Sequence, residues 1–165
     1  MSYICDSNKD FMQPYISEYQ VFNPDFKEQI HDSLTRQEFL KLIGFELNVI
    51  EPGRMEGIMD FKKMHQQQVG FAHGGLVATL ADTTAGFAAF SLVPPGHHVV
   101  TGELKISYLN PGVGEQLKSV GWVLKQGKKI NFCEAEVWSI DKGVEKIVAK
   151  ASASMITIFP GDFKS

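Results

Sequence analysis

The sequence predicts an α+β fold in which one long helix is wrapped by a curved antiparallel sheet. The first observation is a run of small and apolar residues from His73 to Ala88, in which alanines recur at helical spacing and form a smooth face for close packing. The second is a series of four strand-like segments after this run, separated by short turns. Early strands, one long helix and a later meander of strands are typical of an α+β domain.

The composition fits one ordinary globular domain. The chain has 165 residues, 44% of them hydrophobic, and a net charge of −3. We expect an N-terminal extension over residues 1–25, a single domain over 26–160 and a short tail over 161–165. No basic block is present, so nucleic acid is not an expected partner. No apolar run approaches the roughly 20 residues that span a bilayer, so a membrane is not expected either.

The start of the chain and its two cysteines favour a cytoplasmic location. The first residues lack a basic stretch followed by an apolar one, so secretion is not expected. Cys5 and Cys133 lie far apart, and neither has a metal-binding spacing. Reduced thiols in the cytoplasm are the default for such cysteines. Cys133 alternates with Ala135 and Val137, so we expect it in the core.

The elements before the long helix are predicted from spacing and turn residues. A peripheral amphipathic helix is expected over residues 26–42, ended by Gly44. Its apolar positions among many charges are Ile30, Leu34, Phe39 and Leu42. Two strands are then expected over 45–50 and 55–61, on either side of a turn at 51–54.

The elements after the long helix form the meander. Proline and glycine at 94–96 break the chain, and four strands are expected over 99–109, 116–125, 130–140 and 145–158. Glycine-containing turns at 110–112, 126–128 and 141–143 separate them.

A lone carboxylate, Asp82, lies inside the apolar helix. Burying an ionisable group costs free energy unless something binds it or uses it. At the front of the same helix, Gly74 and Gly75 leave backbone N–H groups unshielded, where a negative oxygen can bind. A carboxylate and an anion-stabilising helix end together suggest acyl-transfer chemistry.

The spacing of these two features predicts a dimer. Asp82 follows Gly74 by eight residues, which is about 12 Å along a helix. Both groups must lie about 3 Å from the substituents of one reacting carbon, so one helix cannot supply both. Two helices packed antiparallel across a twofold axis can, because each Gly74 then meets the partner's Asp82. We therefore expect an isologous dimer with two active sites at its interface.

Three motifs carry a resemblance to a known family. They are His73-Gly74-Gly75 followed by Thr79-Leu80-Ala81-Asp82, the strand from Val100 to Leu109, and the turn Lys125-Gln126-Gly127-Lys128. Over about residues 39–158 the chain resembles the PaaI-type hotdog-fold acyl-CoA thioesterases. The resemblance implies the hotdog fold, hydrolysis of an acyl-CoA thioester to free acid and coenzyme A, and no cofactor. It also implies a homodimer that commonly pairs into a homotetramer.

The resemblance implies a catalytic role for five residues. Asp82 takes the place of the helical aspartate, which acts as nucleophile or as general base on a water. Gly74, from the partner subunit, donates its N–H to the thioester oxygen, and His73 at the helix mouth orients its neighbours. Thr101 occupies a strand position where a hydroxyl helps to hold the water. Gln67 replaces an asparagine six residues before the histidine, and its extra methylene changes its reach.

The resemblance further implies contacts to the nucleotide and pantetheine of coenzyme A. The residues concerned lie in two turns and are Tyr108, Asn110, Lys125, Gly127, Lys128 and Lys129. Lysines suit phosphate as point charges, although a solvated turn is the plain alternative. His97 and His98 do not predict a metal site, because adjacent strand residues point to opposite faces and no third ligand stands at a useful spacing.

Other interpretations of the same residues stay open at this point. Asp82 can be the N-cap of a second helical piece, and His73 can simply cap or pack at the helix start. The glycines can serve tight helix packing, and Thr101 can be an ordinary strand residue. The alternative functions are a non-catalytic acyl-CoA sensor and a hotdog-fold enoyl-thioester hydratase. The sequence does not indicate the acyl group.

Overall fold

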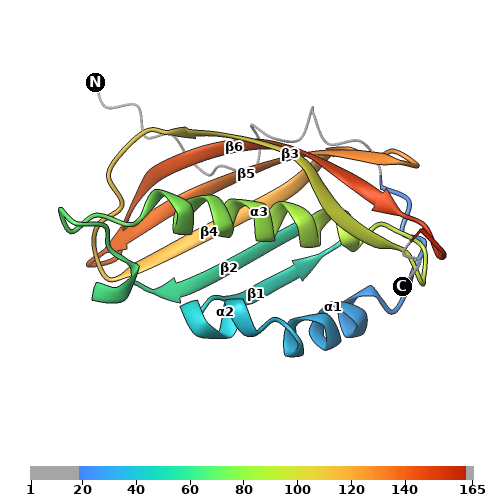
Figure 1. Ribbon diagram of the computed structural model, residues 1–165, viewed down its shortest axis with the longest axis horizontal. Helices are drawn as coiled ribbons and strands as arrows, with labels where there is room; N and C mark the ends of the chain where they lie inside the picture. The colour runs from blue at the N-terminus through green and yellow to red at the C-terminus, as the bar shows by residue number, and fades with distance from the viewer. Residues whose placement is uncertain (1–18, 163–165) are drawn as a thin grey trace, which may run out of the picture.

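The computed structural model describes residues 19–162 and shows one long helix lying on a six-stranded antiparallel sheet (Figure 1). The helix α3 spans Gly74–Phe90 and packs against strands β2, β4, β5, β6 and β3, which lie side by side in the sheet. The strand order is β1-β2-β4-β5-β6-β3, and every neighbouring pair is antiparallel. This arrangement confirms the predicted α+β fold with a helix wrapped by a sheet.

The predicted strands and turns match the structure closely. The six strands are β1 (Glu46–Glu51), β2 (Arg54–Asp60), β3 (His98–Tyr108), β4 (Gln116–Lys125), β5 (Ile130–Asp141) and β6 (Val144–Ile158). A short 3-10 turn, η2 (Lys63–His65), lies between β2 and α3. Strand β3 forms one edge of the sheet, and most of its residues are exposed.

The N-terminal helical region differs from the prediction. One helix over residues 26–42 was expected, but the chain forms two, α1 (Phe26–Thr35) and α2 (Glu38–Ile43). Gln37 between them has φ −91° and ψ 77°, outside the helical region, so α2 starts with a new orientation. Phe39 and Leu42, two of the four apolar positions of the expected helix, are 55% and 69% exposed in the structure. Leu40 is buried in their place.

Helix α3 lies unusually close to β4, because Gly121 has no side chain. A Cβ at Gly121 would lie 2.4 Å from the carbonyl carbon of Thr84 and 2.5 Å from the nitrogen of Ala85, both in the α3 backbone. The Thr84 hydroxyl, buried at this contact, lies 2.9 Å from the Ser119 hydroxyl. This contact fixes the depth of α3 in the sheet, and with it the position of the residues on the opposite face of the helix.

The described part of the N-terminal extension lies against the end of the sheet. The Tyr19 hydroxyl donates to the carbonyl oxygen of Val123, and burial raises the pKa of Tyr19 to about 12. Gln20 and Gln126 exchange two hydrogen bonds of 2.8 Å. The remainder of the predicted extension, residues 1–18, and the end of the tail, 163–165, lie outside the described residues. No helix among residues 19–162 is long and apolar enough to cross a membrane.

Cys133 lies in the core, as predicted. It is 1% exposed, on the face of β5 that turns toward α3. Burial raises the pKa of its thiol to about 12, because the thiolate would lose its hydration. The thiol is therefore protonated at neutral pH and behaves as a small apolar side chain.

Candidate active site

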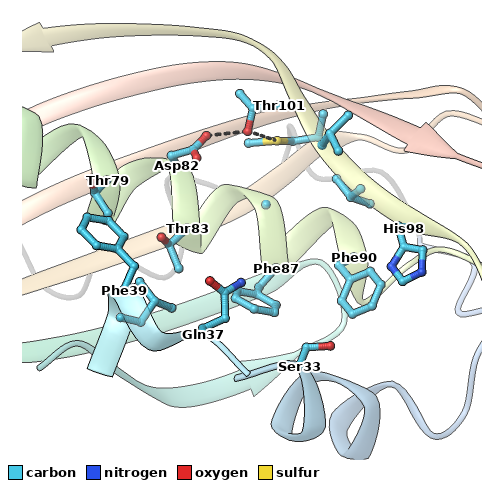
Figure 2. Close-up of a pocket in the computed structure, with 15 residues that line it drawn as sticks. Ser33, Gln37, Phe39, Thr79, Asp82, Thr83, Phe87, Phe90, His98 and Thr101 are labelled. Carbon is cyan, nitrogen blue, oxygen red and sulfur yellow. Dashed lines mark hydrogen bonds between the residues drawn. The ribbon is translucent and has the colours of Figure 1, made fainter. Parts of the chain in front are cut away.

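A cleft of about 400 Å³ opens beside the middle of α3 (Figure 2). Its floor is the exposed face of α3, and its walls are β3 on one side and the α1–α2 pair on the other. Residues of the floor include Asp82, Thr83, Gly86, Phe87 and Phe90, and those of the walls include Gln37, Leu40, Val99 and Thr101. The volume lies in the range of small-molecule sites, which are about 300–1,000 Å³.

Asp82 and Thr101 meet in this cleft, although they lie on different elements. The Thr101 hydroxyl donates to Oδ1 of Asp82 at 2.7 Å, and its oxygen also lies 3.6 Å from the sulfur of Met155 (Figure 2). A hydroxyl has one proton, so the shorter bond to the carboxylate uses it. Asp82 is half-buried and lies inside an unbroken helix, so it is not the N-cap of a second helical piece.

The N-terminal end of α3, the helix mouth, is capped by His73. This residue is the N-cap, and its Nδ1 accepts a hydrogen bond from the Gly75 N–H at 3.0 Å. Since Nδ1 accepts, the neutral ring carries its proton on Nε2. Gly74 is the first helical residue, so its N–H has no partner within the helix. A Cβ at Gly74 would make only ordinary contacts, 3.4 Å from the hydroxyl of Tyr108, so packing within the chain does not require glycine there.

Tyr108 and Gln67 also lie near the helix mouth. The Tyr108 hydroxyl donates to the carbonyl oxygen of Gly74 at 2.8 Å. The side-chain oxygen of Gln67 accepts from the Val69 N–H at 2.5 Å, so the amide folds back onto its own loop. The structure thus gathers His73, Gly74, Tyr108 and Gln67 at one end of α3, while Asp82 and Thr101 lie half a helix away.

The candidate coenzyme A-binding residues of the lysine-bearing turn do not lie near the helix mouth. The turn that carries Lys125 and Gly127 lies beyond the C-terminal end of α3, where Gln126 donates to the carbonyl oxygen of Leu92 at 3.2 Å. That end is about 24 Å from Gly74 along the helix. The lysines of the turn, Lys125, Lys128 and Lys129, are exposed. Within one chain they are therefore remote from the helix mouth.

Asn110 has a structural contact of its own. Its Nδ2 donates to the carbonyl oxygen of Ile147 at 2.9 Å, which ties the turn after β3 to β6. The adjacent histidines also have local contacts, since the His97 ring packs on Phe159 and the His98 ring stacks on Phe90.

His65 is a residue that the sequence did not single out. It is 5% exposed, its Nδ1 accepts from the Lys62 N–H at 2.9 Å, and its carbonyl oxygen accepts from the His73 N–H at 2.9 Å. Burial, with the charge of Lys62 as a smaller cause, lowers the pKa of His65. The backbone carbonyl of His65 therefore holds the N-cap residue of α3 in place, while its ring ties down the Lys62 amide. A lone histidine among polar residues carries no periodic signal that predicts this position.

The fold and the site together define a class of protein. A hotdog-type α+β fold presents a hydroxyl-bonded carboxylate in a cleft and an unshielded glycine amide at the mouth of the same helix. A carboxylate and a backbone amide donor are groups of the kinds that can take part in hydrolysis of an activated acyl compound.

Comparisons with known proteins identify the family. A model of the thioesterase superfamily matches residues 69–146. A thioesterase family protein from Silicibacter pomeroyi superposes with a TM-score of 0.80 and 31% identity, covering 81% of this chain and 98% of that chain. Human acyl-coenzyme A thioesterase 13 is 29% identical over 126 residues, 75% of this chain and 88% of the relative. A Bacillus halodurans protein solved with CoA has a TM-score of 0.67 and 28% identity, covering 86% and 97%.

The chain belongs to the thioesterase superfamily, whose members are thioester hydrolases. The PaaI protein of E. coli has the same fold, with a TM-score of 0.75 at 21% identity over 84% of this chain and 97% of that chain. The resemblance to PaaI-type hotdog thioesterases predicted from the sequence is confirmed.

Proposed function

We propose that the protein is an acyl-CoA thioesterase that hydrolyses its substrate to a free carboxylic acid and coenzyme A. The observation that carries the proposal is the 2.7 Å hydrogen bond from the Thr101 hydroxyl to the Asp82 carboxylate inside the cleft. Family membership supports the reaction, and the CoA bound to the Bacillus halodurans protein supports the leaving group.

In the proposed reaction Asp82 acts on the carbonyl carbon of the thioester. As general base it takes a proton from a water, and the resulting hydroxide adds to the carbon. As nucleophile it adds to the carbon itself, and water then hydrolyses the mixed anhydride. In both routes the C–S bond breaks and the coenzyme A thiolate leaves. The Thr101 hydroxyl donates a hydrogen bond to Asp82, and the lone pairs of the same hydroxyl oxygen can accept a hydrogen bond from the attacking water.

The oxyanion formed in this step needs a donor that the same helix cannot supply. The Gly74 N–H lies about 12 Å from Asp82 along α3. We propose that the donor is the Gly74 amide of a second subunit, whose helix packs antiparallel to the first. His73 sets the direction of this amide by capping the helix. The homodimer is thus part of the proposal, and a homotetramer of two such dimers is the proposed full assembly.

The coenzyme A contacts remain proposals of the same kind. In an antiparallel dimer the mouth of one α3 approaches the other subunit, so turns that are remote within one chain can serve one ligand. We propose that Tyr108, Asn110 and the lysine-bearing turn from Lys125 to Lys129 bind the nucleotide and pantetheine. We also propose a single thioesterase domain over residues 26–160 and a cytoplasmic location.

Asp82→Asn tests the function. The amide keeps the size of the side chain and removes the base, so thiol release from a panel of acyl-CoA thioesters should fall at least about 1,000-fold. The matched control is Asp25→Asn, an exposed aspartate whose side chain caps nothing, which should leave the rate unchanged. Circular dichroism and sedimentation show whether fold and assembly persist. Activity that survives Asp82→Asn would refute the proposal, and saturable binding without hydrolysis by the wild type would indicate a sensor.

A further inference from the structure

Gly86 is a glycine in the middle of α3 for which packing within the chain gives no reason. A Cβ built at Gly86 meets no described atom within 4 Å. Glycine in a helix interior is less favourable than alanine, because it loses more backbone entropy on folding. Gly121, by contrast, is required by the α3 backbone that lies against it. Gly86 lines the cleft one turn after Asp82, so its missing side chain leaves the cleft floor open.

The side chains that α3 presents to the cleft change from an ionisable one at Asp82 to an aromatic one at Phe90. On the C-terminal side of Asp82 the helix contributes the aromatic rings of Phe87 and Phe90 to the cleft, and the polar side chains of Ser33, Gln37 and His98 lie around these rings (Figure 2). Toward the N-terminus, α3 presents Thr79 and leads to the polar helix mouth. Among residues 19–162, the ionisable side chains that line the cleft are Asp82 and His98. An apolar acyl group is therefore better accommodated toward Phe90.

The proposed dimer leaves this part of the cleft uncovered by the partner's helix. If the Gly74 amide of one subunit meets Asp82 of the other, each α3 begins level with the other's Asp82. Residues 83–90 then lie past the end of the partner's helix. The open space above Gly86 is thus available to a ligand rather than to close helix packing.

We infer that Gly86 is a specificity-determining residue, and that the cleft above it takes an uncharged, apolar acyl chain of medium length. This inference rests on the proposed function. Asp82 and Phe90 are about 12 Å apart along the helix. Carbon–carbon bonds of about 1.5 Å advance roughly 1.25 Å each in an extended chain, so about nine or ten carbons span this length. The described part of the chain places no lysine or arginine in the cleft to pair with a second carboxylate on the acyl group.

The test is a graded series, Gly86→Ala and Gly86→Leu, assayed with straight-chain acyl-CoA thioesters from acetyl to dodecanoyl. The readout is the ratio of kcat/KM for octanoyl-CoA to kcat/KM for acetyl-CoA. We expect the leucine variant to lower this ratio about 10- to 100-fold, because its side chain fills the space of the acyl chain. The alanine variant should lower it less. Thr35→Leu, at an exposed position of α1 outside the cleft, is the matched control and should leave the ratio unchanged.

A second readout separates this inference from the proposed function. Non-hydrolysable thioether analogues of the same acyl-CoA series are titrated into each variant by calorimetry. If the wild type hydrolyses nothing, the proposed function fails, while a chain-length-dependent loss of affinity in Gly86→Leu still supports the acyl site. A ratio and affinities that do not change with the size of residue 86 would overturn the inference. Dissociation of the assembly by Gly86→Ala would overturn it as well, since Gly86 would then serve the subunit interface.

Discussion

Replacing Thr101 by valine isolates the hydroxyl that contacts the proposed catalytic carboxylate. Valine has the same shape as threonine and a high strand propensity, and Thr101 is exposed on β3, so the fold should persist. What is lost is the 2.7 Å hydrogen bond to Asp82. Hydrogen bonds to charged groups contribute about 1.5–3 kcal/mol, which corresponds to roughly 10- to 150-fold in rate.

The structure favours the lower part of that range. Asp82 is only half-buried, so water can replace the hydroxyl and keep the carboxylate solvated, though not in a fixed orientation. We therefore expect kcat of Thr101→Val to fall about 10- to 30-fold with KM nearly unchanged. Thr101→Ser, which keeps the hydroxyl, should recover most of the rate. Steady-state thiol release provides the assay. Equal kcat values for the valine variant and the wild type would show that the contact has no part in catalysis.

Two further predictions concern the scaffold of the site. Gly121→Ala should lower the free energy of unfolding by about 3 kcal/mol, because its Cβ meets the α3 backbone at Thr84. Gly86→Ala should raise the free energy of unfolding by up to about 1 kcal/mol. Urea unfolding measures both changes. Because the folded-state pKa of His65 lies below its ordinary 6.5, the unfolded chain takes up the proton first, so stability is fully present above pH 6.5 and falls below it. His65→Asn keeps a hydrogen-bond acceptor but does not titrate, so it should flatten the dependence of Tm on pH between pH 7.5 and 5.5. His31→Asn, at an exposed site, should not. Identical dependences of Tm on pH for the wild type and His65→Asn would contradict this account.

The strands were predictable because residues typical of turns mark where each strand ends. Glycine at positive φ occurs at Gly53 and Gly143, each at a turn between strands, and alternation of side chains defines the segments between turns. The break between α1 and α2 was not predictable in the same way. It falls at Arg36 and Gln37, where no glycine or proline marks it, and the charges on both sides fit a continuous helix. Tertiary contacts of Leu40 override the local pattern there.

The candidate site was predictable as a set of residues and not as an arrangement. Asp82 stands out because a carboxylate is rare in an apolar helix, and Thr101 was singled out by resemblance as a residue that holds water. Their direct contact depends on the register of β3 against β6, which includes a shift between Thr101 and Glu103 that the sequence does not reveal. Gln37 lies in the cleft wall because the helix breaks beside it, and the sequence pattern did not predict this break.

Two features of the isolated chain have one explanation. Among residues 19–162, β3 is a long edge strand with mostly exposed side chains. An unpaired edge is a liability in a monomer because it invites pairing with another chain. The exposed face of α3 carries a carboxylate at Asp82 and an unshielded amide at Gly74 that are too far apart to act on one carbonyl. Antiparallel pairing of two copies along β3 would satisfy the edge and place each amide opposite the other copy's carboxylate. The surface that is unfavourable in one chain is therefore the one that the proposed chemistry needs, and the twofold symmetry of the proposed dimer would give two identical sites.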